Sequence, residues 1–325
     1  MKDKKTMSHN QPLPNASEQD TKTSDLQNGG LRELLENAEK PSPARHPEQD
    51  SAIVTPLGKR ATHSPAEENL QKRKIRARTL KLDRDQLHAK RILVDGEVGH
   101  AGVAYKVLRT KVYKAFGDNG WSSVGITSAN PAEGKTTTAI NLAYAFARAV
   151  RNVVVLVDFD FHRPNVHNTL GFNPPAGIID YLRGDVLISE VLYRVEGTDL
   201  FVIPGRLVDD LPLDMMSNHA IPKFHQLLKG MFPSGYIFYD LPPVLHVDDA
   251  LVFEDKDCNL LIAAEGDTSI DDLHHAMELL SGQNMLGYVL NKSRHGSRIS
   301  KYGYTYYGYG SYGGYGSYSG YPNKA

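Results

Sequence analysis

The chain has 325 residues, of which 40% are hydrophobic, and a formal net charge of −1, so it is long and apolar enough to bury a sizeable core. It has no run of about 18 apolar residues, its N-terminus lacks the apolar core of a signal peptide, and its one cysteine, Cys258, excludes an internal disulfide. We therefore expect a cytoplasmic protein without a membrane span.

The N-terminal part of the chain lacks the composition of a folded domain. Residues 1–78 are rich in Pro, Ser, Asn, Asp, Glu and Lys. Because such a segment cannot bury enough apolar surface to offset the entropy of ordering, we expect a disordered leader. Between Gln71 and Arg91 there are nine Lys or Arg residues and two acidic ones. A solvated helix face, a membrane or partner contact and a nucleic-acid contact each use such a block, and we expect no nucleic-acid partner. Residues 79–100 carry apolar side chains that predict a segment packed on the domain.

Periodic hydrophobic segments fill residues 101–295, which we expect to form one domain. Apolar residues at helical spacing predict a helix from Ala104 to Phe116, just before the first strand. Continuous apolar runs then alternate with helical patterns. The expected strands are 122–127, 153–157, 200–203, 236–239, 260–264 and 286–290, and the expected helices are 135–149, 178–182, 221–231 and 270–280, with one more near Ala250. This alternation predicts an α/β fold with a doubly wound, mostly parallel sheet, helices on both faces, and a ligand at the carboxyl ends of the strands.

A phosphate-binding loop is expected where the first of these strands leads into a helix. Residues 128–137 have the sequence SANPAEGKTT. In such a turn several backbone N–H groups and the positive end of the helix dipole point at one spot where an anion can sit. Lys135 would reach the β and γ phosphates, the Thr136 hydroxyl would coordinate Mg²⁺, and Gly134 would allow close approach of the backbone. Ala129 stands where the strict motif has its first glycine, so an ordinary strand-to-helix turn is the alternative.

Three aspartates follow apolar strands at the edge of the sheet where this loop is expected. Asp158 and Asp160 follow the strand 153–157, and Asp240 follows the strand 236–239. A carboxylate at the end of a buried strand costs desolvation unless a cation compensates it, and a nucleotide-bound Mg²⁺ supplies that cation. Helix caps are the alternative, because Asp is a good N-cap residue. Together with the lysine and threonine of the loop, the aspartates predict a Mg²⁺–nucleotide site.

Three motifs then occur in order along the chain, a Walker A motif over 128–137, a Walker A′ motif over 155–164 and a Walker B motif over 237–244. In this combination the chain resembles the bacterial tyrosine kinases of capsular and exopolysaccharide biosynthesis, over roughly residues 80–321. The resemblance to these kinases also includes the segments 211–216, 246–250 and 287–292. These enzymes are deviant P-loop NTPases.

The resemblance implies an ATP-dependent protein-tyrosine autokinase that uses Mg²⁺ and regulates capsular or exopolysaccharide synthesis and export. It implies that Lys135, Asp158, Asp160 and Asp240 are catalytic, with Asp158 taking the tyrosine proton, since a phenol with a pKa near 10 needs a base or a nearby cation. It implies that Thr136, Asp160 and Asp240 hold Mg²⁺ directly or through water. The implied nucleotide-binding residues are Asn130, Pro131, Ala132, Glu133, Gly134, Lys135, Thr136, Thr137 and, at the adenine, Asn291.

The C-terminal segment, residues 296–325, holds more than half of the chain's 17 tyrosines, interleaved with Gly and Ser. With so much glycine and no alternating core pattern, we expect a flexible tail that can present each hydroxyl to an active site. A self-associating low-complexity segment is the alternative, but a nucleotide site in the same chain favours phosphoacceptors. The expected phosphoacceptors are Tyr302, Tyr304, Tyr306, Tyr307, Tyr309, Tyr312, Tyr315, Tyr318 and Tyr321.

Two alternative functions share this fold, a switch ATPase of the partitioning type and a non-catalytic nucleotide-binding regulator of polysaccharide export. The partitioning ATPases carry an extra lysine in the loop where this chain has Asn130, and this difference and the tyrosine tail favour the kinase. The chain has neither the H-R-D nor the D-F-G motif of eukaryotic kinases, which excludes that fold.

Departures from the family's pattern concern assembly and the nucleotide. In the assembly motif E-x-x-R-x-x-R-T, Val103 and Lys106 replace the Glu and the first Arg, while Arg109 and Thr110 are kept. Because half of an intersubunit ion pair is lost, we expect weakened self-association or other contacts. Ala264 stands where the family usually has Arg near the nucleotide, so we expect lower ATP affinity. The resemblance also implies a separate transmembrane co-polymerase that controls polysaccharide chain length and recruits the kinase to the inner face of the membrane.

Overall fold

The computed structural model of the chain describes residues 75–93, 99–150, 152–207, 220–246, 253 and 255–293. The strands are β1 Arg78–Leu80, β2 Ser123–Ser128, β3 Val154–Asp158, β4 Tyr193–Val195, β5 Leu200–Ile203, β6 Tyr236–Asp240, β7 Cys258–Ala264 and β8 Met285–Asn291. The helices are α3 Arg84–Ala89, α4 His100–Asn119, α5 Lys135–Ala149, α6 Val166–Leu170, α7 Ile178–Arg183, α8 Ile188–Val191, α10 Ala220–Met231 and α12 Ile270–Leu279.

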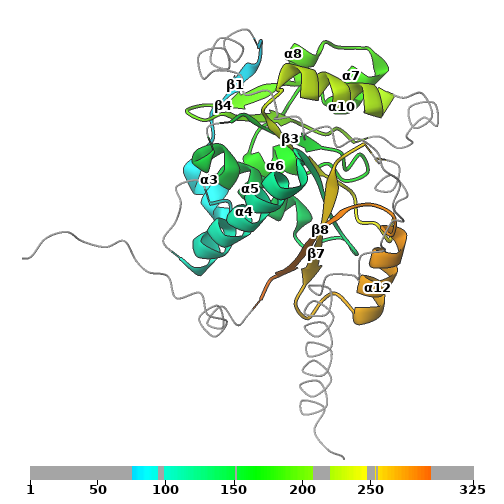
Figure 1. Cartoon of the computed structure of the whole chain (residues 1–325). Coiled ribbons are helices and arrows are strands. Elements are labelled where there is room, and N and C mark those ends of the chain that lie inside the picture. Colours follow the sequence, from blue (N-terminus) through cyan, green and yellow to red (C-terminus); the bar gives the residue numbers. More distant parts are fainter. Residues whose placement is uncertain are drawn as a thin grey trace, which may run out of the picture. The chain divides into compact units, whose positions relative to one another are not determined.

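The strands form one eight-stranded sheet in the order β1-β4-β5-β3-β6-β2-β7-β8 (Figure 1). Strand pairs are parallel except for β4 with β5, which is antiparallel. The doubly wound, mostly parallel sheet expected from the sequence is therefore confirmed. The strands β2, β3 and β6 are neighbours at its centre, so their carboxyl ends meet at one place on the sheet edge.

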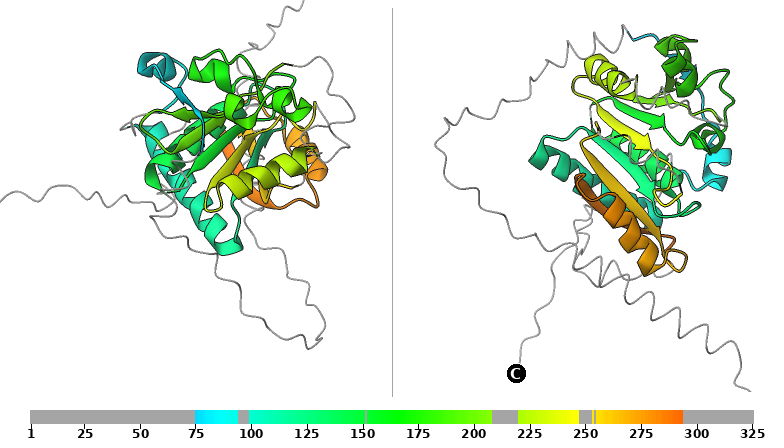
Figure 2. Two further views of the ribbon diagram at one scale, coloured as in Figure 1. Left: turned by 90° about the horizontal axis from the view of Figure 1, so that it is seen from above. Right: turned by 90° about the vertical axis from the view of Figure 1, so that its right-hand side faces the viewer.

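Helices cover both faces of the sheet (Figure 2). On one face α4 and α5 pack on alternate strand residues such as Leu156 and Phe238, which are fully buried. On the other face the next residues along the same strands, Val157 and Tyr239, are also fully buried, in a cluster with α7 and α10. The helix α12 packs on β7 in a third cluster. Because both faces are covered, β3 and β6 carry uninterrupted apolar runs rather than alternating ones.

The expected helices and strands of the domain are present, mostly within one or two residues of the predicted ends. The helix that begins at Ala104 in the sequence pattern is longer in the structure, because α4 starts at His100 and ends at Asn119. The helix expected near Ala250, nearly all of the expected disordered leader and the tyrosine tail lie outside the described residues.

Sequence patterns did not predict the two short strands at the β1 edge of the sheet. β1 and β4 have three residues each and pair in parallel with one another, against the direction of the six other strands. The segment expected to pack on the domain thus contributes an edge strand and three core residues, Leu80, Leu87 and Ile92. A three-residue strand is too short to show a periodic pattern, so such a strand forms only where the fold supplies a pairing partner.

Candidate functional site

The loop between β2 and α5 has the geometry of an anion-binding site. Gly134 is the residue before the helix and has a left-handed φ of +97°, and no side chain caps the first turn of α5. The first backbone N–H groups of this helix are therefore available to an anion, together with the positive end of the helix dipole. A Cβ at Gly134 would lie 2.0 Å from Asn291 Nδ2, so the site requires glycine for its φ and for space.

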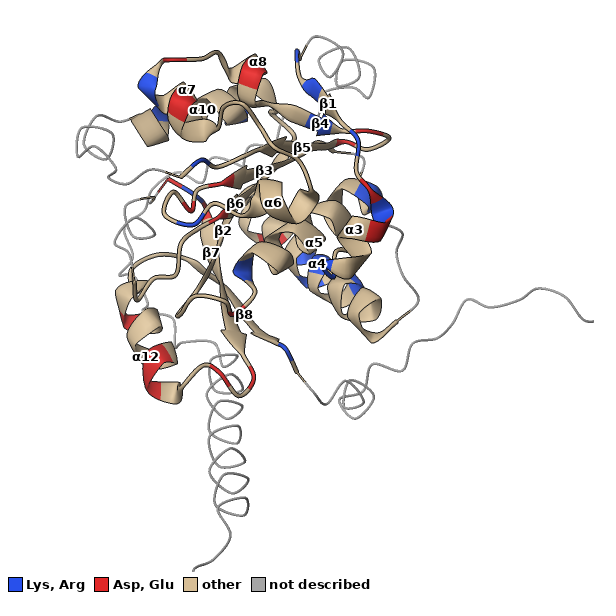
Figure 3. Cartoon of the chain, turned by 180° about the vertical axis from the view of Figure 1, so that it is seen from behind, with Lys and Arg blue, Asp and Glu red and all other residues tan. Residues whose placement is uncertain are grey.

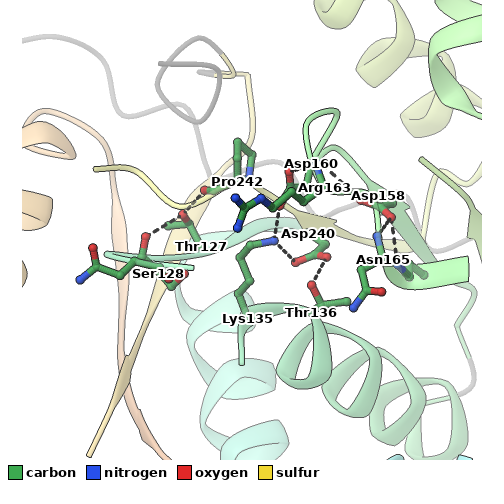
Figure 4. Close-up of polar contacts among 12 residues, drawn as sticks. Thr127, Ser128, Lys135, Thr136, Asp158, Asp160, Arg163, Asn165, Asp240 and Pro242 are labelled. Carbon is green, nitrogen blue, oxygen red and sulfur yellow. Dashed lines mark hydrogen bonds and ion pairs between the residues drawn. The ribbon is translucent and has the colours of Figure 1, made fainter. Parts of the chain in front are cut away.

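Lys135 is the first residue of α5 and points at the carboxyl ends of β3 and β6 (Figure 4). Its Nζ lies 2.6 Å from Asp160 Oδ2 and 3.6 Å from Asp240 Oδ1, and all three side chains are at least nine-tenths buried. Burial lowers the pKa of Lys135, but the charges of Asp240 and Asp160 outweigh that effect and raise it above its usual value. The lysine is thus a buried cation held by two carboxylates.

Asp240, the last residue of β6, joins this cluster to the next residue of the loop. Thr136 Oγ1 donates a hydrogen bond of 2.7 Å to Asp240 Oδ2. Among the described residues, Asp240 Oδ1 is buried and accepts no hydrogen bond, although Lys135 lies within ion-pair distance. Burial raises the pKa of Asp240, and the positive charge of Lys135 opposes that rise. Asp240 Oδ1 can therefore bind a cation without breaking a hydrogen bond.

Asp158, at the end of β3, lies opposite Asp240 in the register of the sheet. Its Oδ2 accepts hydrogen bonds of 3.0 Å from the backbone N–H groups of Asn165 and Val166, at the start of α6, and its Oδ1 accepts one from Asp160 N. The helix-cap alternative noted from the sequence therefore applies to Asp158. Burial raises the pKa of Asp158 to about 8, and the charge of Asp240 adds to this rise.

The loop that follows β3 carries Asp160 and Arg163 side by side (Figure 4). Asp160 Oδ1 accepts a hydrogen bond of 2.9 Å from Arg163 N. The Arg163 side chain is exposed. Behind the loop, a Cβ at Gly205 would lie 2.9 Å from Asp158 Cγ and 2.7 Å from Pro164 Cβ, so the segment after β5 packs closely against this carboxylate.

Residues 130–132 form the part of the loop that precedes Glu133. Pro131 and Ala132 make the turn of the loop, where Pro131 is partly exposed and Ala132 is exposed and has a φ of +64°. Asn130 is fixed by two side-chain contacts, since its Nδ2 donates to Asp272 Oδ2 at 2.9 Å and its Oδ1 lies 3.0 Å from His246 Nε2. Asp272, in the first turn of α12, has no local sequence signal for this contact, because only the fold brings it to the loop.

Asn291 and Thr137 complete the set of expected nucleotide-binding residues. Asn291 ends β8, and its Nδ2 donates a hydrogen bond of 2.8 Å to the carbonyl of Glu133, so it braces the phosphate loop. Its Oδ1 makes no hydrogen bond with the part of the chain that the structure describes. Thr137 lies partly exposed in the first turn of α5.

The altered assembly motif lies on α4, which carries several Lys and Arg positions, drawn blue on its ribbon (Figure 3). Val103 is partly exposed and Lys106 is exposed. Both positions are therefore accessible on this helix, and the weakened self-association stays a prediction. Ala264 ends β7 and is fully buried, with its N–H bonded to Thr268 Oγ1.

Among the described residues there is no group of three or more His, Cys, Asp or Glu side chains arranged to hold a metal ion alone. Thr136, Asp160 and Asp240 would therefore provide only an incomplete set of oxygen ligands. Such a set fits Mg²⁺, which proteins usually hold with one or two carboxylates plus substrate phosphates and water. None of the helices in the described ranges has the length and apolar character needed to cross a bilayer.

Comparison with known proteins identifies relatives over most of the domain. Residues 125–305 match the model of the CobQ/CobB/MinD/ParA nucleotide binding domain. The tyrosine-protein kinase YwqD of Bacillus subtilis is 30% identical over 208 residues, which are 63% of this chain and 85% of that protein. The tyrosine-protein kinase CpsD of Streptococcus pneumoniae is 32% identical over 184 residues, which are 55% of this chain and 79% of that protein.

Solved structures show the same fold. The chimerical protein CapA2B2 superposes with a TM-score of 0.58 at 22% identity, covering 71% of this chain and 99% of that one. The kinase domain of the Escherichia coli tyrosine kinase ETK superposes with a TM-score of 0.56 at 24% identity, covering 70% of this chain and 94% of that one.

Proposed function

The chain belongs to the bacterial tyrosine-protein kinases, within the CobQ/CobB/MinD/ParA nucleotide-binding family, and we propose that it transfers the γ-phosphoryl group of ATP to tyrosines of its own C-terminal cluster. The observation that carries this proposal is the buried group of Lys135, Asp160 and Asp240 at the start of α5. A cation beside a free helix N-terminus holds phosphates, and the carboxylates beside it hold the metal that accompanies them.

The site's own residues fit Mg²⁺ as the metal of the nucleotide. Thr136 Oγ1 and Asp240 Oδ2 are already joined by a hydrogen bond, and Asp240 Oδ1 has an acceptor position to spare. Thr136, Asp160 and Asp240 would hold the ion directly or through water. When bound, Mg²⁺ supplies positive charge against the negative charge that develops on the phosphates.

Lys135 binds and orients the phosphates in this proposal. Its Nζ is paired with Asp160 and Asp240, and phosphate oxygens would take over part of that pairing. The backbone N–H groups at the start of α5 hold the same oxygens. Because phosphoryl transfer needs little covalent chemistry from the protein, positioning and charge stabilisation are its main contributions.

The reaction moves one proton and exchanges one bond. The tyrosine oxygen forms a bond to the γ-phosphorus, the bond from that phosphorus to the β–γ bridging oxygen breaks, and ADP leaves. Asp158 takes the phenol proton in this scheme. Two features support that role, a pKa raised to about 8 by burial, which suits a base near neutral pH, and a spare acceptor position. A carboxylate has about four such positions, and three here are used by backbone N–H groups.

The acceptors are proposed to be the nine tyrosines of the tail, modified mainly in trans between neighbouring copies. Each phosphorylation adds close to two negative charges, so repulsion among modified tyrosines would loosen an assembly. The resemblance further supports a role in capsular or exopolysaccharide synthesis and export. It also supports a separate transmembrane co-polymerase as partner and recruitment to the inner face of the membrane.

Incubation of the purified full-length chain with labelled ATP and Mg²⁺, followed by mass spectrometry, tests the proposal. Phosphate is expected on the tail tyrosines of the wild-type chain and absent from Lys135→Met, whose far-ultraviolet circular dichroism should still show the folded domain. Release of inorganic phosphate without phosphotyrosine would instead identify a switch ATPase. Nucleotide binding without either product would identify a non-catalytic regulator. Phosphotyrosine that persists in purified Lys135→Met would mean that the site is elsewhere.

A further inference from the structure

A second polar network holds the phosphate loop from the side opposite the aspartates. Its centre is Glu133, the residue before Gly134, which is only 2% exposed. Glu133 Oε2 accepts a hydrogen bond of 3.0 Å from Asn130 N, and Glu133 Oε1 accepts one of 2.5 Å from Thr268 Oγ1. The carboxylate therefore joins the first half of the loop to its second half and to the turn between β7 and α12.

The Thr268 hydroxyl can serve only as the donor in its hydrogen bond with Glu133. This hydroxyl accepts a hydrogen bond of 2.8 Å from Ala264 N, at the end of β7. A hydroxyl has only one proton to donate, and that proton is committed to Glu133. Thr268 is only 7% exposed, so water does not readily replace its hydroxyl as a donor to Glu133. The hydrogen bond from Ala264 N at the end of β7 orients this hydroxyl towards the carboxylate.

The buried carboxylate makes this network important for the shape of the loop. Burial raises the pKa of Glu133, while hydrogen bonds from Thr268 and Asn130 oppose that rise. No ion pair accompanies Glu133 among the described residues, so these donors are what stabilise the carboxylate. Losing one of them leaves a buried acceptor unsatisfied, and the loop must move to regain a partner.

We infer that Glu133 and Thr268 are positioning residues for the nucleotide phosphates, because together they fix the loop in its binding conformation before ATP arrives. Neither side chain needs to touch the nucleotide for this role. Its physical basis is preorganisation, since a loop that is already ordered loses less entropy on binding. The inference rests on the proposed function, because it concerns the same nucleotide site.

The test compares Thr268→Val, which removes the hydroxyl at nearly constant size, with Thr268→Ser, which keeps it. Thr138→Val is the matched control, because Thr138 on α5 is 1% exposed and its hydroxyl has no hydrogen-bond partner among the described residues. Binding of ATP with Mg²⁺ to the full chain is measured by titration calorimetry, and KM and kcat by tail phosphorylation. Melting temperatures without nucleotide report on folding.

Thr268→Val is expected to weaken ATP binding and raise KM about tenfold, the effect of losing one hydrogen bond to a charged group, with kcat nearly unchanged. Thr268→Ser and Thr138→Val should bind ATP as the wild type does. Wild-type affinity in Thr268→Val, or an equal loss in either of the other two variants, overturns the inference. Should Thr268→Val fail to fold, Glu133→Gln is used instead. Its amide group cannot accept the hydrogen bonds from both Asn130 N and Thr268 Oγ1. Unchanged ATP affinity in Glu133→Gln overturns the inference as well.

The outcome for the wild-type chain separates this inference from the proposed function. A wild-type chain that binds no ATP contradicts the proposed function and removes the basis for the inference. A wild-type chain that binds ATP and phosphorylates its tail, together with an unaffected Thr268→Val, overturns the inference alone.

Discussion

Replacing Lys135 by Met should destabilise the ligand-free domain in a pH-dependent way, apart from its effect on activity. The lysine is the only cation within ion-pair distance of Asp160 and Asp240 among the described residues, at 2.6 Å and 3.6 Å. Met fills a similar volume but provides no charge and no donor. Two carboxylates that are at least nine-tenths buried then lose their counter-ion.

The expected loss at about pH 8 is about 3–5 kcal/mol, the usual cost of removing one partner from a buried ion pair. For a domain of this size each kcal/mol corresponds to a fall of about 2–4 °C in the melting temperature, so a fall of about 10 °C is expected. The sign of the pH dependence follows from Asp158 and Asp240, whose pKa values in the folded chain lie above the ordinary 3.8. Between pH 3.8 and about 8 Asp158 binds more protons in the folded than in the unfolded chain, so its contribution to the free energy of unfolding falls as the pH rises.

Removing the cation raises the pKa of Asp240 further, so the deficit of the variant should be largest near pH 8 and small near pH 5. Melting curves of both chains at the two pH values measure this. Lys229→Met is the control, because Lys229 pairs with Asp257 at 3.4 Å in a partly exposed position, where such a pair contributes about 0–1 kcal/mol. A deficit of Lys135→Met that is equal at both pH values, or larger at the lower one, refutes the reasoning.

Three further changes test the geometry of the site. Gly205→Ala places a Cβ 2.9 Å from Asp158 Cγ. Because such a contact shifts a group near the reacting atoms, tail phosphorylation should slow by about tenfold. Gly230→Ala is the control, since Gly230 has open space around it, and this variant should keep the wild-type rate. Asn291→Ala removes the hydrogen bond to the carbonyl of Glu133, so calorimetry should show weaker binding of both ATP and pyrophosphate, and a loss confined to ATP would indicate an adenine contact alone. Chelation of Mg²⁺ with EDTA should weaken ATP binding by at least about tenfold, because the carboxylates then face the phosphates without a compensating cation, and equal affinity with and without the chelator would contradict the metal site.

The sequence alone was enough to predict the centre of this fold. Two central strands, β3 and β6, are apolar up to the aspartates that end them, because both of their faces are buried. The phosphate loop was recognisable for a similar local reason, since Gly134 and Lys135 are neighbours in the chain. Where a feature depends on a few adjacent residues, its pattern is visible before the fold is known.

The contacts that support the loop could not be predicted in this way. Glu133 and Thr268 are 135 positions apart, and a glutamate before the glycine of the loop has no local signal that distinguishes an exposed side chain from a buried one. Asp158 presents the reverse difficulty. Its place at the end of a strand fits both a metal ligand and a helix cap, and only the N–H groups of α6 show that it caps the helix.

The charges of the site favour the proposed metal–nucleotide complex over a nucleotide alone. Asp158, Asp160 and Asp240 are three buried carboxyl groups, and Lys135 is the one cation paired with them in the described part of the chain. With Asp158 protonated, two carboxylates still share one lysine, so the site has no positive charge to spare for a triphosphate. The helix N-terminus adds about half a charge. A ligand that brings its own divalent cation would therefore satisfy the carboxylates and leave Lys135 for the phosphates.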